Sequence, residues 1–118
     1  MGSEYSEKKK TPGITAEPCG VPCPIERGMR ILGGKWKASI LWHLKDEPVR
    51  FNELTRQLDG ASKKMINQRL TEMERQGLVI RTVLKEKPIA VSYRISTEGR
   101  SALHILEALK EWALDKAL

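Results

Sequence analysis

The segment from Ser62 to Gln76 carries amide, hydroxyl and cationic side chains at the spacing of a helix. At about 100° of rotation per residue, these polar side chains gather in one sector, away from the apolar ones. Amides make paired hydrogen bonds to adenine, threonine offers a hydroxyl and a methyl group, and cations bind guanine edges or phosphates. The segment therefore suits contact with the major groove of a DNA duplex. The polar set is Ser62, Lys63, Lys64, Asn67, Gln68, Thr71 and Arg75, of which Arg75 is expected nearer the DNA backbone.

The opposite sector of the same segment is apolar. Ile66, Leu70 and Met73 recur at the interval that places them together on one helix face, which predicts that this face packs on a core. Ser62 is a favourable N-cap, and the free N–H groups and dipole of a helix N-terminus favour a phosphate. A helix face that is merely solvated has a similar composition, and for an isolated helix that simpler interpretation is the better one.

The chain before Ser62 changes that balance. Leu54 and Leu58 lie one turn apart and indicate a short helix, with Asn52 as its expected N-cap. A tight turn follows, in which Gly60 is free to take a positive φ. A helix, a turn with glycine and a longer helix form the helix-turn-helix pattern. In this context, DNA contact becomes the favoured interpretation of the polar face.

After Gly77, which is expected to end the long helix, the periodicity changes to that of strands. The runs 79–84 and 91–95 are rich in β-branched residues and are joined by the charged segment 85–88. This pattern predicts a two-stranded hairpin, or wing, whose Lys85 and Lys87 reach the neighbouring minor groove or backbone. Lysines also protect exposed edge strands, so the hairpin alone is weak evidence for DNA contact.

Helices are also predicted on both sides of this unit. Pro24 suits the first position of a helix that ends at Gly33, and a core-packed helix follows from Trp36 to Leu44. After the wing, Ser96 or Thr97 is expected to cap one long final helix. This last helix carries more apolar surface than one core face needs, which suggests that it packs against a partner helix.

Length and composition fit one small domain with a basic DNA-facing part. The chain has 118 residues, 40% of them hydrophobic and 31% charged, which is ordinary globular usage. Its net charge is +6, and the stretch 62–100 holds nine basic and four acidic residues. Residues 1–22 have no apolar period and are expected to form a flexible arm before a domain spanning 23–118. Neither a signal peptide nor a membrane span is apparent, so we expect a cytoplasmic protein.

The two cysteines, Cys19 and Cys23, are too few for a disulfide framework in a cytosolic chain. Cys23 precedes Pro24 at a predicted helix start, and Arg27 lies one turn further on. A helix N-terminus and a nearby cation lower the pKa of a thiol, so a reactive thiolate is physically reasonable. The alternative is a small buried residue at an interface. Cys19 is either a resolving partner for Cys23 or without a role.

The sequence lacks the parts of a small enzyme. There is no Ser/His/Asp or Cys/His arrangement at plausible spacing, no glycine-rich phosphate loop and no cluster of metal ligands. His43 and His104 are predicted on different helices, and a zinc site would need more ligands. We therefore expect neither catalysis, nor a metal, nor a cofactor.

From Cys23 to Trp112 the chain resembles the HxlR family of winged-helix regulators, which is related to the MarR group. The resemblance implies a prokaryotic homodimer that presents two such helices to a pseudo-palindromic DNA site, with the protomers paired through the first and last helices. It also implies that Cys23 matches a cysteine with which several relatives, many of them repressors, sense quinones, aldehydes or disulfide stress. The carrying residues are Cys23-Pro24-Ile25, Ile31-Leu32-Gly33-Gly34-Lys35-Trp36, Arg50-Phe51-Asn52-Glu53-Leu54, Ser62-Lys63-Lys64-Met65, Leu70, Gly77-Leu78-Val79 and Tyr93-Arg94-Ile95-Ser96-Thr97-Glu98-Gly99.

These observations predict an α+β, mostly α fold: a winged helix-turn-helix with a two-stranded wing and flanking N- and C-terminal dimerisation helices. The favoured function is a sequence-specific DNA-binding transcriptional regulator that acts as a homodimer. A repressor is the expected type, and thiol-based sensing of an oxidant or electrophile is a further expectation. The alternative is a winged-helix module for protein interaction, without sequence-specific DNA binding. The expected dimer interface comprises Ile25, Met29, Leu103, Leu106, Leu109, Trp112 and Ala113.

Overall fold

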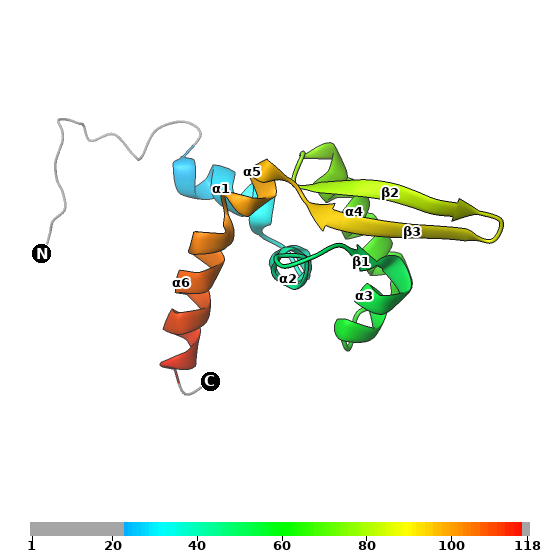
Figure 1. Ribbon diagram of the computed structural model, residues 1–118. Helices are drawn as coiled ribbons and strands as arrows, with labels where there is room; N and C mark the ends of the chain where they lie inside the picture. The colour runs from blue at the N-terminus through cyan, green and yellow to red at the C-terminus, as the bar shows by residue number, and fades with distance from the viewer. Residues whose placement is uncertain (1–22, 117–118) are drawn as a thin grey trace, which may run out of the picture. The chain divides into compact units, whose positions relative to one another are not determined.

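The computed structural model describes residues 23–116 (Figure 1). The predicted arm 1–22, which includes Cys19, lies outside the described residues. The chain divides into two compact units, with the boundary between Gly33 and Gly34. The first unit therefore contributes one described helix, and the second contains all the other helices and the sheet.

Helix α1 spans Pro24–Leu32, as the sequence predicts. Pro24 occupies a position in the first turn, where a backbone N–H has no intrahelical partner, so proline costs nothing there. The helix ends at Gly33, whose N–H donates to the Met29 carbonyl at 2.6 Å. No residue of α1 is buried among the described residues.

The second unit is a winged helix-turn-helix with an α+β fold, which confirms the predicted fold class. Its sheet has three antiparallel strands in the order β1-β3-β2. Strands β2 and β3 form the long hairpin that extends past the helices of this unit in Figure 1. The elements are α2 (Lys37–His43), β1 (Val49–Arg50), α3 (Phe51–Gln57), α4 (Lys63–Arg75), β2 (Val79–Glu86), β3 (Ile89–Ile95), α5 (Thr97–Arg100) and α6 (Leu103–Leu114).

The core lies between α2, α3, α4 and the base of the sheet. The apolar residues that the sequence assigns to a common face of each helix are indeed buried together. Burial of an aliphatic side chain contributes about 1.5–3 kcal/mol, so this cluster supplies much of the drive to fold. The side chains with no exposed surface are Ile40 and Leu41 of α2, Leu44, Leu54 of α3, and Ile66, Leu70 and Met73 of α4.

The sheet differs from the prediction in two ways. Strand β1 was not expected, and its two residues pair with Tyr93 and Ser92 of β3. A strand of two residues is too short to show an alternating pattern. The hairpin strands are also longer than predicted, because cross-strand pairing extends to Glu86 and Ile89. Lys85 therefore lies in a strand, and only Lys87-Pro88 forms the turn.

Two helix boundaries also differ from the prediction. Asn52 is not the N-cap of α3, because β1 leads directly into the helix and the extended Arg50 takes that position. The single final helix is instead two, since α5 ends at Arg100 and α6 begins at Leu103. The predicted cap is confirmed, however, because the Ser96 hydroxyl oxygen accepts a hydrogen bond from the Gly99 N–H at 2.9 Å.

Gly99 provides a test of the packing between α5 and the sheet. A Cβ at this position would lie 2.3 Å from the Leu78 carbonyl oxygen and 2.9 Å from Ile95 Cγ1, so the backbone would have to move. We expect Gly99→Ala to lower the free energy of unfolding by about 1–3 kcal/mol, as overpacking does. Gly28→Ala is the control, because a Cβ there meets nothing within 4 Å. Urea denaturation of both variants measures the effect, and equal stabilities would contradict this account of Gly99.

Candidate nucleic-acid interface

Helix α4 is held with its apolar face in the core and its polar face in solvent. Its start is fixed by Ser62, whose hydroxyl oxygen accepts a hydrogen bond from the Met65 N–H at 3.0 Å, as the sequence predicts. The turn before it places Gly60 at a φ of +95°, and Gly77 after it has a φ of +80°. Both conformations favour glycine, so the local sequence defines both ends of α4.

The polar face of α4 is free to bind a ligand. The side chains of Lys63, Lys64, Asn67, Gln68 and Arg75 are exposed and make no hydrogen bond or ion pair with any residue from 23 to 116. Thr71 differs, because its hydroxyl donates to the Asn67 carbonyl at 2.9 Å. Its methyl group and oxygen lone pairs remain for a partner. Six polar side chains are thus displayed along about 18 Å of helix.

Two basic residues near this face point inward and fix the position of α4. The Lys37 ammonium is buried, lies 3.6 Å from Glu72 Oε1, and donates to Gln76 Oε1 at 3.4 Å. Arg69 forms an ion pair with Glu72 at 3.1 Å and donates to the Lys35 carbonyl at 3.2 Å. These contacts join α4 to the start of α2. They also remove Arg69 from the cations available to DNA.

The buried position of Lys37 was not predicted from the sequence, although its spacing from the apolar residues of α2 indicates it. Lys37 lies three and four positions before Ile40 and Leu41, so it belongs to the buried face of α2. A lysine on such a face requires an acceptor nearby, because an unpaired buried ammonium is costly. The structure supplies Glu72 and Gln76 as acceptors.

The wing carries exposed cations at its far end and a buried aromatic group at its base. Lys85 and Lys87 are exposed. Tyr93 is buried, and this burial raises the pKa of its hydroxyl above the usual value, an effect that a hydrogen bond from Arg81 opposes. Tyr93 therefore stays neutral, and Arg81 forms a hydrogen bond with it at the base of the wing. Arg94 is exposed beside it.

The residues expected at a dimer interface divide into two groups. Leu109 and Trp112 of α6 are 52% and 60% exposed, and Ile25 and Met29 of α1 are 74% and 62% exposed, so all four have apolar surface to offer. Ala113 is also exposed, and Leu103 is half-buried. Leu106 is 6% exposed and belongs to the core of its own chain, because α6 packs there against α2.

Cys23 occupies the predicted position before α1 but is not a free thiol in this structure. It takes the N-cap position with an extended backbone, and its sulfur is disulfide-bonded. The expected free thiolate therefore does not describe this state. Any role for Cys19 concerns a residue outside the described range.

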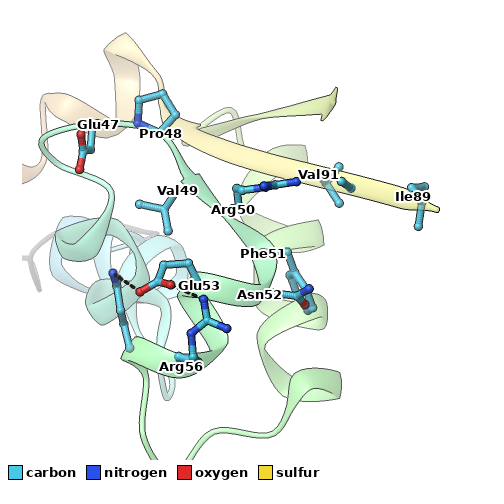
Figure 2. A pocket seen from close by; sticks show the side chains of 12 residues that line it. Glu47, Pro48, Val49, Arg50, Phe51, Asn52, Glu53, Arg56, Ile89 and Val91 are labelled. Atoms are coloured by element: carbon cyan, nitrogen blue, oxygen red, sulfur yellow. Dashed lines mark hydrogen bonds and ion pairs between the residues drawn. The ribbon is translucent and has the colours of Figure 1, made fainter. Parts of the chain in front are cut away.

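A hollow of about 840 Å³ opens between β1, α3 and the outer part of β3 (Figure 2). Arg50, Phe51 and Asn52 line one side, and Ile89, Ala90 and Val91 line the other. The sequence does not predict this hollow, because β1 and the longer β3 that form it were not predicted.

No group of three or more His, Cys, Asp or Glu side chains suited to a metal occurs within residues 23–116. In the same range, no helix is long and apolar enough to span a bilayer.

Comparison with known proteins agrees with this geometry. The family model for the HxlR-like helix-turn-helix matches residues 31–117. An uncharacterized HTH-type transcriptional regulator of Methanothermobacter thermautotrophicus is 39% identical over 90 residues, covering 76% of this chain and 69% of the relative.

Two solved structures share both the fold and a substantial part of the sequence. The redox regulator HypR in its oxidized form has a TM-score of 0.75 and 33% identity, covering 81% of this chain and 99% of HypR. The reduced form of the transcriptional regulator YodB from Bacillus subtilis has a TM-score of 0.67 and 35% identity, covering 77% and 90% of the two chains. These similar proteins are regulators and not enzymes. The chain belongs to the HxlR-like helix-turn-helix family and is a transcriptional regulator of HxlR/MarR type.

Proposed function

We propose that this regulator binds a specific, pseudo-palindromic DNA site as a homodimer, and that it is a repressor whose DNA binding changes when an oxidant or electrophile reacts at Cys23. The observation that carries the DNA-binding part is the division of α4 into two faces. Ile66, Leu70 and Met73 have no exposed surface, while the amides and cations opposite them are exposed and have no partner among residues 23–116. Such side chains match the hydrogen-bonding groups of the major groove.

A protein-interaction module is the alternative. Such a module would use the same exposed face of α4 to bind a protein and would not recognise a DNA sequence. Its affinity for duplex DNA would not show a steep dependence on the salt concentration. Phosphate contacts release counterions, so DNA binding weakens steeply as the salt concentration rises. Selection of bound genomic fragments, followed by titration over a range of salt concentrations, separates the two functions.

The polar face of α4 gives the first prediction from this proposal. We expect the double variant Lys64→Ala/Gln68→Ala to bind the selected site at least about 100-fold more weakly, because each good base contact contributes about 1–3 kcal/mol of discrimination. Weak non-specific binding should remain. Fluorescence anisotropy measures both affinities, and circular dichroism verifies that the variant is folded. Unchanged affinity for the selected site would reject α4 as the element that reads the sequence.

The exposed apolar surface of α6 supports a homodimer. Leu109, Trp112 and Leu114 are 52%, 60% and 77% exposed, and they lie on one terminal helix. Leu109 and Trp112 lie one turn apart and share a helix face, and an exposed apolar face of this kind is typical of an interaction site. The comparison proteins HypR and YodB are regulators of the same fold, and a dimer would present two copies of α4 to a two-fold symmetric DNA site.

We therefore expect Leu109→Asp/Trp112→Asp to shift the protein from dimer to monomer, because buried carboxylates at the interface would be desolvated. Sedimentation velocity of the parent and the variant measures the change. Leu84→Asp serves as the matched control, since Leu84 is also 50% exposed but lies on the wing. A double variant that stays dimeric, or a parent that is monomeric at all concentrations, would exclude α6 as the dimer contact.

The position of Cys23 at the start of α1 supports redox control. It is disulfide-bonded here, and the similar protein HypR is a redox regulator solved in oxidized and reduced forms. We expect diamide to change the affinity of the reduced parent for its DNA site by about tenfold or more, which corresponds to about 1.4 kcal/mol. Cys23→Ser should respond less than about twofold on the same scale. A variant that responds like the parent would rule out sensing at this residue.

A further inference from the structure

The hollow between β1, α3 and β3 contains one arginine, Arg50, that has no acidic partner among residues 23–116. Arg50 is exposed, and its guanidinium makes no hydrogen bond or ion pair with any residue from 23 to 116. Figure 2 shows its side chain extended from β1 in the direction of Val91 on β3, and both residues line the hollow. The guanidinium is therefore available to a ligand that enters the hollow.

The second arginine of the hollow is in a different state. Arg56 forms an ion pair and a hydrogen bond with Glu53, and Gln57 donates to the other oxygen of the same carboxylate at 3.4 Å (Figure 2). The hydrogen bond with Arg56 holds the pKa of Glu53 below its usual range, so the carboxylate stays ionised and the pair carries no net charge. Glu47 also lines the hollow, and it is drawn apart from Arg50 in Figure 2. The unmatched positive charge therefore lies at Arg50.

The wall opposite α3 is an open strand edge. Strand β1 pairs only with Tyr93 and Ser92, so β3 has no neighbour on that side from Ile89 to Val91 among the described residues. On its other side the same stretch is fully paired with β2. Backbone hydrogen-bonding groups at an open edge need water or a ligand. The hollow thus combines one free guanidinium with an unpaired polar edge, and it is open to solvent along its length.

The position of the hollow identifies the ligand. It lies between the wing, whose turn begins at Lys87, and α3, which leads through the turn at Gly60 into α4. A protein that places one element in the major groove and another in the adjacent minor groove must straddle the phosphodiester strand between the two grooves. We propose that Arg50 binds a phosphate of this intervening strand, so that the hollow is a third DNA contact in addition to those of α4 and the wing.

This inference rests on the proposed DNA binding and deepens it. At about 3.4 Å per residue, Ser92, the cross-strand partner of Arg50, lies roughly 15 Å along β3 from the turn. The contact is thus separate from those of Lys85 and Lys87. Arginine is suited to this role because its planar guanidinium can bind two phosphate oxygens. A free small anion has the same chemistry, but a hollow beside the wing, on the helix that leads into α4, favours a phosphate that arrives as part of a duplex.

The experiment is a double-mutant cycle between one side chain and one phosphate. The selected DNA site is synthesised with single neutral methylphosphonate groups placed in turn along both strands, and binding is measured by fluorescence anisotropy. We expect Arg50→Ala to bind the unmodified site about tenfold more weakly, with a salt slope shallower by about two units, because the dimer loses one phosphate contact in each half-site. One methylphosphonate position per half-site should weaken the parent similarly but leave Arg50→Ala unaffected. Arg50→Lys should recover the salt slope and part of the affinity.

The control is Glu53→Gln/Arg56→Gln, which removes the internal ion pair of the hollow without changing its net charge. Its affinity and salt slope should match those of the parent. If the parent binds DNA and Arg50→Ala binds equally well, the phosphate contact is wrong while the proposed function stands. A change in the NMR signal of Arg50 Nε with inorganic phosphate, but not with DNA, would assign the hollow to a free anion. A parent without salt-dependent DNA binding would instead overturn the proposed function itself.

Discussion

Burial of the apolar side of α4 is the constraint on which the interface depends. Ile66, Leu70 and Met73 have no exposed surface, and the loss of each from the core would cost several kcal/mol. Rotating α4 about its axis by even a third of a turn would expose these side chains and bury cations and amides in their place. The direction of the polar face is therefore set by the core.

Rotation about the axis is only one degree of freedom, and polar contacts restrict the others. Lys37 is almost fully buried and approaches both Glu72 and Gln76 at the end of α4. A buried ammonium is tolerated only where acceptors surround it, so sliding α4 along its axis would break both of these contacts to a buried charge. At the other end the Ser62 cap and the turn at Gly60 fix the first N–H groups. The helix is thus held at both ends as well as along its buried face.

Helical periodicity and capping made most of this arrangement predictable. The three buried residues of α4, its Ser62 cap and the glycine conformations on either side follow from local rules that need no tertiary information. Strand β1 did not follow, because its two residues gain stability only from pairing with β3. The break between α5 and α6 and the inward position of Leu106 depend equally on packing against distant residues.

The hollow with Arg50 could not be predicted for the same reason. A lone arginine before a helix carries no signal until the sheet register places it opposite Ser92 and leaves residues 89–91 of β3 without a neighbour on that side within the described chain. The resemblance to the family includes Arg50 within the five-residue match 50–54, but the match does not explain why a cation stands at this position. Pairing, exposure and the absence of an internal acceptor within the described chain supply that reason.

The junction after α4 shows how the separate contacts are joined mechanically. The Ser96 hydroxyl donates to the Gly77 carbonyl at 2.6 Å and accepts from the Gly99 N–H at 2.9 Å, while its own N–H donates to the Leu78 carbonyl at 3.0 Å. One serine thus links the end of α4, the start of the wing and the first turn of α5. A displacement of α5 cannot leave these three hydrogen bonds intact unless the ends of α4 and the wing move with it. The spacing between the two proposed DNA-contacting elements is consequently sensitive to whatever positions the C-terminal helices.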